Sequence, residues 1–182
     1  MKKYGIFNEN FMNIDGLITN KENKVLSLTF ADCTPIYLFD KTKKVIGNIH
    51  SGWEGTVKNI VKKAIQFMKQ KYNSKPEDII CAIGPTIRNC HFEVQKDVRD
   101  IFYNEFKYMK NIDNIIKYNE KTKTYFIDTV AINMNLLKQE GIPEKNIIDS
   151  KICTFCNSNI IHSYRKEGKK AGRNTAIISL KN

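Results

Sequence analysis

The chain has 182 residues, of which 41% are apolar and 27% are charged, a composition typical of folded globular proteins rather than disordered ones. This length favours a single domain over residues 1–182. No apolar run approaches the roughly 20 residues that a membrane helix needs, and the first residues lack the apolar region of a secretory signal. We therefore expect a cytoplasmic protein with no membrane partner.

The chain is strongly basic. Thirty Lys and Arg residues against nineteen Asp and Glu residues give a formal net charge of +11. Such an excess favours anionic partners, which include nucleic acid, phosphorylated metabolites and inorganic phosphate. Lys residues are spread along the whole chain, and aromatic residues do not alternate with basic ones as they do on single-strand-binding surfaces. The sequence therefore argues against a specific nucleic-acid partner and favours a small-molecule one.

The first half of the chain predicts strands followed by a helix. Residues 24–30, 36–39 and 45–50 have the apolar and β-branched content of strands. From Gly55 to Tyr72 apolar residues recur every three or four positions, which indicates an amphipathic helix with a lysine-rich solvent face. A buried strand is expected at residues 79–83.

The second half alternates helices and strands. A helix is expected at residues 95–106, a polar stretch without clear period follows, and TKTYFID reads as a strand. Asp128 is a good N-cap for a helix at 129–140, and further strands are expected at 146–149 and 174–180. The alternation, which includes hairpins, predicts a mixed α/β fold with a mixed β-sheet.

A hairpin could bring Cys33 and His50 together. If residues 36–39 pair with 45–50 around a turn at Lys41, opposite residues have numbers that sum to 83, which places Cys33 opposite His50. Opposite residues share one face with Cβ atoms about 4.5–5.5 Å apart, close enough for a thiolate–imidazole pair or for two ligands of one metal. The turn lacks a tight-turn signature, and a slip of one residue would separate the two side chains. A buried Cys and a separate, hydrogen-bonded His remain the alternative.

The other cysteines and Asp32 allow more than one interpretation. The odd count of five cysteines argues against a disulfide framework, and Cys81 lies in an apolar strand pattern. Cys153 and Cys156 form C-x-x-C, half of a zinc knuckle or a redox pair, but no second C-x-x-C is present. Asp32 could orient His50, act as a base, or form a turn through its carboxylate.

Five motifs occur in a recognisable order: ADCTP, HSGWEG, AIGPTIRNCHFEV, IDTVAINMNLLKQEGI and CTFCNSNIIHSYRKEGKKAGR. Together they resemble the YfiH-type laccase-domain family, once labelled multicopper polyphenol oxidoreductase and now associated with purine nucleoside phosphorylase and adenosine deaminase activity. The resemblance extends from about Asp15 to the C-terminus. It implies a layered α/β/β/α arrangement in which mixed β-sheets are covered by helices.

The resemblance also implies a zinc site in which Cys33 and His50 are ligands and one position stays open for water or phosphate. Zinc-bound water would be the nucleophile of a deamination. Phosphate, as co-substrate, would cleave the N-glycosidic bond of inosine or adenosine and leave ribose 1-phosphate and the free base. Arg165 and Arg173 belong to the last motif and are candidates for binding the anion, although both could simply face solvent.

Two features depart from the family pattern. The third zinc ligand of the family is a His upstream of the Cys, and counting back from Cys33 passes the first residue, so we expect an N-terminally short member. His91 could substitute as a ligand, or be an ordinary loop residue, and a neighbouring subunit of a homo-oligomer could also supply the ligand. Glu54 stands where the family often has a basic residue, which weakens the expectation of phosphate binding.

Three other functions are the alternatives to this interpretation. A metal-free Cys-His hydrolase or deamidase would use Cys33 as nucleophile and His50 as base. A degenerate family member would serve only as a binding module. Copper-dependent phenol oxidation is disfavoured because three histidines cannot furnish several copper centres.

Overall fold

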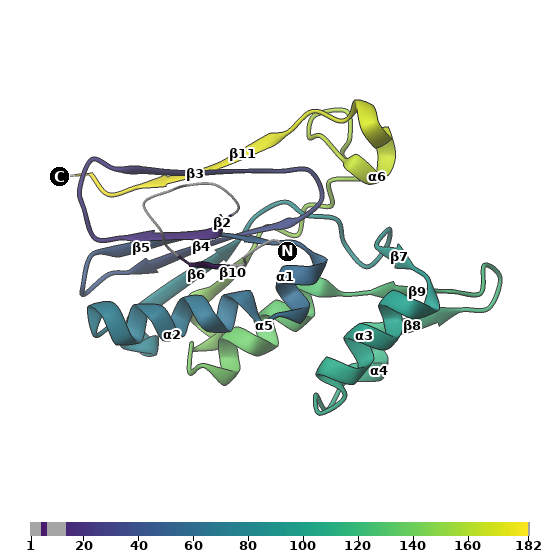
Figure 1. The fold of residues 1–182 in the computed structure, drawn as a ribbon, viewed down its shortest axis with the longest axis horizontal. Coiled ribbons are helices and arrows are strands. Elements are labelled where there is room, and N and C mark those ends of the chain that lie inside the picture. The colour runs from purple at the N-terminus through teal and green to yellow at the C-terminus, as the bar shows by residue number, and fades with distance from the viewer. Residues whose placement is uncertain (1–4, 7–13, 182) are drawn as a thin grey trace.

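The computed structural model describes residues 5–6 and 14–181, and a six-stranded sheet forms its centre (Figure 1). The strand order is β1-β2-β5-β4-β6-β10. The strands are β1 (Gly5–Ile6), β2 (Ile14–Thr19), β4 (Thr34–Asp40), β5 (Val45–Ser51), β6 (Ile79–Ile83) and β10 (Ile147–Asp149). β1 with β2 and β10 with β6 are parallel, whereas the other pairs are antiparallel. The predicted mixed α/β class with a mixed sheet is therefore confirmed.

A two-stranded antiparallel ribbon, β3 (Val25–Phe30) with β11 (Asn174–Ser179), lies over one face of the central sheet (Figure 1). Asn48 on β5 joins the two layers, because its buried side-chain amide donates hydrogen bonds to the carbonyls of Leu26 and Ala176 at 3.1 and 2.9 Å. A third, smaller sheet contains β7 (Glu93–Val94), β9 (Thr124–Ile127) and β8 (Ile116–Asn119).

The α-helices are α1 (Trp53–Val57), α2 (Ile60–Tyr72), α3 (Lys96–Phe106), α4 (Ile112–Ile115), α5 (Thr129–Gln139) and α6 (Tyr164–Glu167), and short 3-10 turns lie at Pro76–Asp78, Glu144–Asn146 and Gly168–Lys170. Helices α2 and α5 lie over the opposite face of the central sheet, whereas α3 and α4 lie beside the small sheet and α6 lies near the end of β11 (Figure 1). Within the described part of the chain, every helix is too short or too polar to cross a membrane.

The prediction of one continuous helix between Gly55 and Tyr72 is wrong, because two helices, α1 and α2, cover this range. Asn59 has a left-handed backbone (φ +57°), which separates α1 from α2. Asn tolerates this conformation better than most residues, and nothing in the apolar spacing marks the break. The apolar stripe of α2 packs as expected: Val61, Ile65 and Met68 are fully buried between the helix and the sheet.

The polar stretch at residues 107–123 contains two elements that the sequence analysis missed, α4 and β8. β8 has no buried side chain and pairs only with β9, so its sequence shows no alternation. The helix start predicted at Asp128 is confirmed, because its carboxylate accepts a hydrogen bond from the backbone N–H of Ala131 at 2.9 Å. α5 then ends before Gly141, whose φ of +95° suits glycine.

Candidate active site

The β4–β5 hairpin has a different register from the predicted one. Asp40 is opposite Val45 and Pro35 is opposite His50, so the connection has four residues rather than two. The Asp40 carboxylate accepts hydrogen bonds from the backbone N–H groups of Thr42 and Lys43 at 2.9 and 2.8 Å, which stabilises this longer turn. The predicted pairing of Cys33 directly with His50 is therefore wrong by two residues.

Cys33 and His50 nevertheless lie close together. A shift of two residues preserves the face on which each side chain projects, so the two remain diagonal neighbours on one side of the hairpin. Both border Gly52: a Cβ atom added there would lie 3.2 Å from Sγ of Cys33 and 3.6 Å from Cε1 of His50. The neighbouring Cys33 side chain also contributes to raising the pKa of the His50 ring. A thiol and an imidazole thus meet at the open end of the hairpin.

Asp15 holds the imidazole of His50 from the other side. Its Oδ1 lies 2.8 Å from Nδ1 of His50, and both side chains are about one quarter exposed. β2 pairs with β5 so that Gly16 is opposite Ile49, which places Asp15 beside His50. Burial of the ring opposes its charge, but the hydrogen bonds to Asp15 and Cys33 outweigh this and raise the pKa of His50 to about 10. The arrangement therefore favours an imidazole that carries a proton at neutral pH.

The sequence analysis did not identify Asp15, because it did not predict β2. The only local signal is the short run IDGLIT at residues 14–19, whose apolar residues do not alternate strictly with polar ones. Nothing in that run indicates which strand it joins. The pairing with β5 is what turns this Asp into a partner of the His.

A pocket of about 180 Å³ opens beside Cys33. Part of its wall is apolar and aromatic, formed by Trp53, Ile87 and Phe92, while hydroxyl groups and one guanidinium contribute polar atoms. The polar lining residues are Asp32, Thr34, Ser51, Thr129, Tyr164 and Arg165. Such a mixed lining suits a small ligand with a flat apolar part and a polar end.

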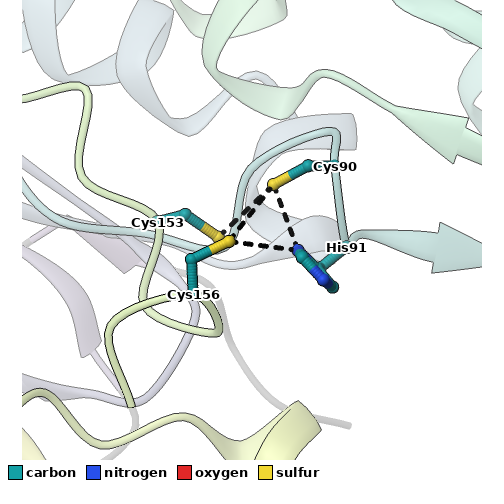
Figure 2. A group of neighbouring side chains, drawn as sticks. All are labelled: Cys90, His91, Cys153 and Cys156. Atoms are coloured by element: carbon teal, nitrogen blue, oxygen red, sulfur yellow. Dashed lines mark hydrogen bonds between the residues drawn. The ribbon is translucent and has the colours of Figure 1, made fainter. Parts of the chain in front are cut away.

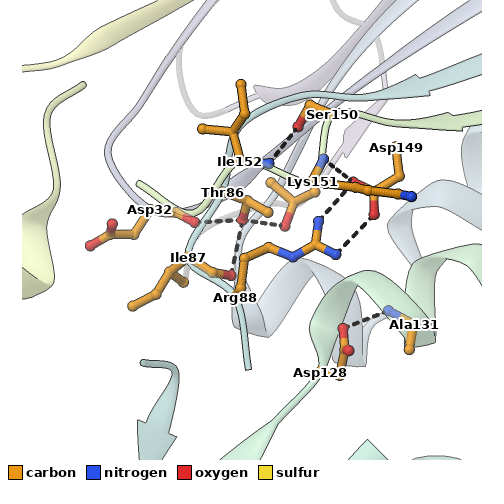
Figure 3. Close-up of polar contacts among 11 residues, drawn as sticks. Asp32, Thr86, Ile87, Arg88, Asp128, Ala131, Asp149, Ser150, Lys151 and Ile152 are labelled. Carbon is orange, nitrogen blue, oxygen red and sulfur yellow. Dashed lines mark hydrogen bonds and ion pairs between the residues drawn. The ribbon is translucent and has the colours of Figure 1, made fainter. Parts of the chain in front are cut away.

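Asp32 joins three segments around this pocket. It is buried (8% exposed) and has φ +85°, and its two carboxylate oxygens accept hydrogen bonds from Oγ1 of Thr154 at 2.5 Å and from the backbone N–H of Arg165 at 2.6 Å. Its carbonyl accepts further hydrogen bonds from Thr86 and Ile87 (Figure 3). In this geometry Asp15, rather than Asp32, contacts His50. A catalytic role of Asp32 stays a prediction.

Of the two candidate arginines, the structure brings Arg165 to the pocket. Its Nη1 donates to the carbonyls of His91 and Glu93, both at 3.0 Å, and its guanidinium lies 5.9 Å from the centre of the Phe92 ring. Arg173 instead donates to the carbonyls of its own loop, at residues 171 and 172, and it does not line the pocket.

His91 lies in a different group of side chains. Its Nδ1 is 3.1 Å from Sγ of Cys90 and 3.4 Å from Sγ of Cys156, and Cys153 completes the group (Figure 2). Among residues 5–6 and 14–181, no close group of three or more metal-binding side chains includes Cys33 or His50. The structure therefore places His91 with three cysteines, and its expected role beside Cys33 and His50 stays a prediction.

An ion pair that the sequence analysis missed anchors the loop leading to this group. The guanidinium of Arg88 binds the carboxylate of Asp149 through two hydrogen bonds of 2.7 and 2.8 Å (Figure 3). Burial raises the pKa of Asp149, but the hydrogen bonds and charge of Arg88 outweigh it, so that this pKa is lowered. The loop after β6 is thereby fixed to the end of β10.

Comparisons with known proteins agree with this structure. Residues 2–181 match the family described as multi-copper polyphenol oxidoreductase laccase. A purine nucleoside phosphorylase of Borreliella burgdorferi is 39% identical over 86% of this chain, and a protein named adenosine deaminase RL5, from an unknown prokaryotic organism, is 32% identical over 88%. This chain spans 65% and 60% of the lengths of those two relatives.

A solved structure shares the fold. The Bacillus licheniformis hypothetical protein YfiH superimposes with a TM-score of 0.86 at 33% identity, over 92% of this chain and 62% of that one. The sequence match and the shared arrangement of sheets and helices lead to the same assignment. The chain belongs to the multi-copper polyphenol oxidoreductase laccase family, of which YfiH-type proteins are members.

Proposed function

We propose that this protein is a zinc-dependent purine nucleoside phosphorylase that converts inosine or adenosine and phosphate to the free base and ribose 1-phosphate. The observation that carries the proposal is the meeting of Cys33 and His50 beside a pocket with an aromatic wall. The names of its relatives support the reaction class. Because the chain spans about two thirds or less of their lengths, the activity of the whole relatives is transferred here only as a proposal.

The donor set at this position suits zinc. Thiolate and imidazole are both common zinc ligands, and a His ligand usually has its other ring nitrogen held by a carboxylate, as Asp15 holds Nδ1 of His50. Gly52, without a side chain, lies beside Sγ of Cys33 and the ring of His50. Binding requires a neutral imidazole and a thiolate, so zinc would displace their protons. A third protein ligand would have to come from outside the described residues or from a neighbouring subunit.

Zinc bound there would supply Lewis-acid activation of an oxygen ligand. The residues of the chain would position the substrates. The aromatic wall of Trp53 and Phe92 offers a flat surface for a purine base. Arg165 would bind phosphate: its described hydrogen bonds use only Nη1, which leaves Nε and Nη2 for the anion. The acidic side chain of Glu54 is paired with Lys58 at 3.3 Å, which offsets its repulsion of phosphate.

Adenosine deamination is the second candidate, supported by the relative that carries that name. A metal-free hydrolase is a further alternative, and in it His50, whose pKa is raised to about 10, would be protonated at neutral pH and would not serve as the general base. It could only pair as a cation with a Cys33 thiolate nucleophile. The five unbridged cysteines suit a reducing cytoplasm, which we propose as the compartment.

The test is an assay of inosine with phosphate, alongside a zinc measurement, for wild type, Cys33→Ser and His50→Ala. We expect base release that requires phosphate in the wild type and a loss of at least 100-fold in both variants. Cys81→Ala is the control, because Cys81 is a core residue of β6. Undiminished turnover in Cys33→Ser would contradict the assignment of the site. Ammonia release from adenosine in the same samples separates deamination from phosphorolysis.

A further inference from the structure

A second group of soft donor atoms lies apart from the Cys33–His50 pair. Cys90, His91, Cys153 and Cys156, called the Cys3His cluster below, place one nitrogen and three sulfurs within 4.8 Å of one another (Figure 2). Two residues come from the loop after β6 and two from the C-x-x-C segment, so chain segments 63 residues apart meet at one point.

We propose that the Cys3His cluster binds one zinc ion, which fastens the loop of residues 84–94 to the segment of residues 150–165. Three thiolates and one imidazole form one of the common donor sets of structural zinc sites, which are tetrahedral and closed to water. The site is distinct from the one that Proposed function assigns, and it needs no ligand beyond the described residues.

The distances agree with a tetrahedral centre. Zinc–sulfur bonds of about 2.3 Å and zinc–nitrogen bonds of about 2.0–2.1 Å give edges of roughly 3.7 Å between sulfurs and roughly 3.5 Å between sulfur and nitrogen. Sγ of Cys90 lies 3.6 Å from that of Cys153 and 3.9 Å from that of Cys156. The two sulfur–nitrogen distances to His91 are 3.1 and 3.4 Å. These four distances are close to the edges of a tetrahedron, and all the donor atoms lie within 4.8 Å of one another.

The backbone holds the two segments in this position. Thr86 pairs with Cys153 in a parallel bridge, with hydrogen bonds of 3.2 Å to the carbonyl of Ile152 and 3.0 Å from the N–H of Thr154. The C-x-x-C turn is closed by Asn157, whose side-chain amide donates to the carbonyl of Cys153 at 2.8 Å. These contacts place the four donor side chains close together before the ion binds, so binding costs little conformational entropy.

The His91 ring is oriented by packing. It stacks on Phe155 with ring centres 3.9 Å apart and an angle of 18° between the planes, which directs Nδ1 toward the sulfurs. Nζ of Lys166 lies 4.7 Å from the centre of the Phe155 ring. Zinc with three thiolates carries a net charge of −1, so a neighbouring ammonium group is favourable.

The Cys3His cluster and the pocket share the loop of residues 84–94. The carbonyl of His91 is one of the two that hold the guanidinium of Arg165, and Ile87 and Phe92 of the same loop line the pocket. The exposed thiols of Cys90 and Cys156 give zinc access from solvent. Fixing this loop to the C-terminal segment would therefore stabilise one wall of the pocket.

The test begins from a Cys33→Ala/His50→Ala double variant, so that zinc at the first site cannot contribute. After dialysis against zinc and then against metal-free buffer with reductant, we expect about one zinc per chain in this double variant and none after Cys156→Ser is added. Cys156 is exposed, so its substitution costs little packing. Replacement of zinc by cobalt should give the intense charge-transfer and visible bands of tetrahedral cobalt thiolate.

Three controls complete the design. Cys81→Ala added to the double variant should keep the ion, and so should His91→Cys, which retains four donors. Zinc at 100 times its Kd should raise the unfolding midpoint of the double variant by roughly 5–10 °C, and the Cys156→Ser version should not respond. Absence of zinc from the double variant, or zinc that persists after Cys156→Ser, would overturn the proposal, whatever the outcome of the inosine assay.

Discussion

The carboxylate of Asp15 lies 2.8 Å from Nδ1 of His50, across the antiparallel pairing of β2 with β5. Cys33, just before β4, lies beside the same ring and helps to raise its pKa. Three strand ends thus contribute one side chain each to a single cluster. This carboxylate fixes the ring so that Nε2 is the nitrogen left for a metal or a substrate.

Replacing Asp15 by Asn tests this relationship. The amide keeps the size of the side chain but removes its charge, so the ring loses its electrostatic support and its fixed orientation. We expect zinc affinity at the Cys33–His50 site to fall by roughly 10–100-fold, measured by competition with a chromogenic chelator in protein that carries Cys156→Ser. Asp113→Asn, at an exposed position on α4, is the control. Equal affinities in the two variants would contradict the role of Asp15.

Gly52 provides a steric test of the same site. Its φ of −69° is accessible to alanine, but the added Cβ would lie 3.2 Å from Sγ of Cys33 and displace that sulfur by a few tenths of an ångström. We expect Gly52→Ala to lower kcat/KM by roughly tenfold, because reacting groups tolerate little misplacement, with little change in the unfolding midpoint.

The matched control is Gly55→Ala in α1, where the added Cβ would meet its nearest neighbour at an ordinary 3.5 Å. This variant should keep wild-type activity. A large loss of activity in Gly55→Ala and none in Gly52→Ala would show that the space beside Cys33 has no functional importance.

The two arginines of the last motif should behave differently. Arg165→Lys removes the planar fork that binds an anion and the hydrogen bonds to the carbonyls of His91 and Glu93. We expect the KM for phosphate to rise roughly tenfold in this variant, whereas Arg173→Lys should stay within about twofold of wild type. Initial rates at varied phosphate concentration measure this, and a larger effect at Arg173 would mean that the anion binds elsewhere.

The Arg88–Asp149 pair predicts a pH dependence of stability. The pKa of Asp149 is lowered from its ordinary value of 3.8. A carboxylate with a lowered pKa contributes stability above its unfolded pKa, and this contribution is lost as the pH falls through the folded pKa. We therefore expect Arg88→Gln to lower the free energy of unfolding by about 1–3 kcal/mol at pH 7, and by much less below the folded pKa of Asp149.

Urea unfolding at several pH values measures this difference. Lys96→Gln is the control, because the Lys96 side chain is 73% exposed and its pair with Asp100 should contribute little. If the deficit of Arg88→Gln were the same at every pH, the pair would not be the cause of the destabilisation.

Much of the fold could be predicted from local patterns. The strands at 24–30, 79–83 and 174–180 and the helix that begins after Asp128 follow from periodicity and capping, which depend on residues a few positions apart. Neither β2 nor β8 could be predicted in this way. β8 has four residues and no buried side chain, and the apolar residues of the six-residue β2 do not alternate strictly with polar ones.

The candidate site divides in the same way. The sequence left open whether Cys33 and His50 share a face, because a register error of one residue would have separated them, whereas the observed difference of two residues keeps them on one side of the hairpin. Asp15 contacts His50 from 35 positions away, and Cys90 meets Cys153 from 63 positions away. The sequence by itself determined the order of most elements, because periodicity and capping are local properties of the chain. Only the tertiary structure decided which carboxylate holds the imidazole and which four side chains form the Cys3His cluster, because contacts between distant segments depend on how the sheets and loops pack.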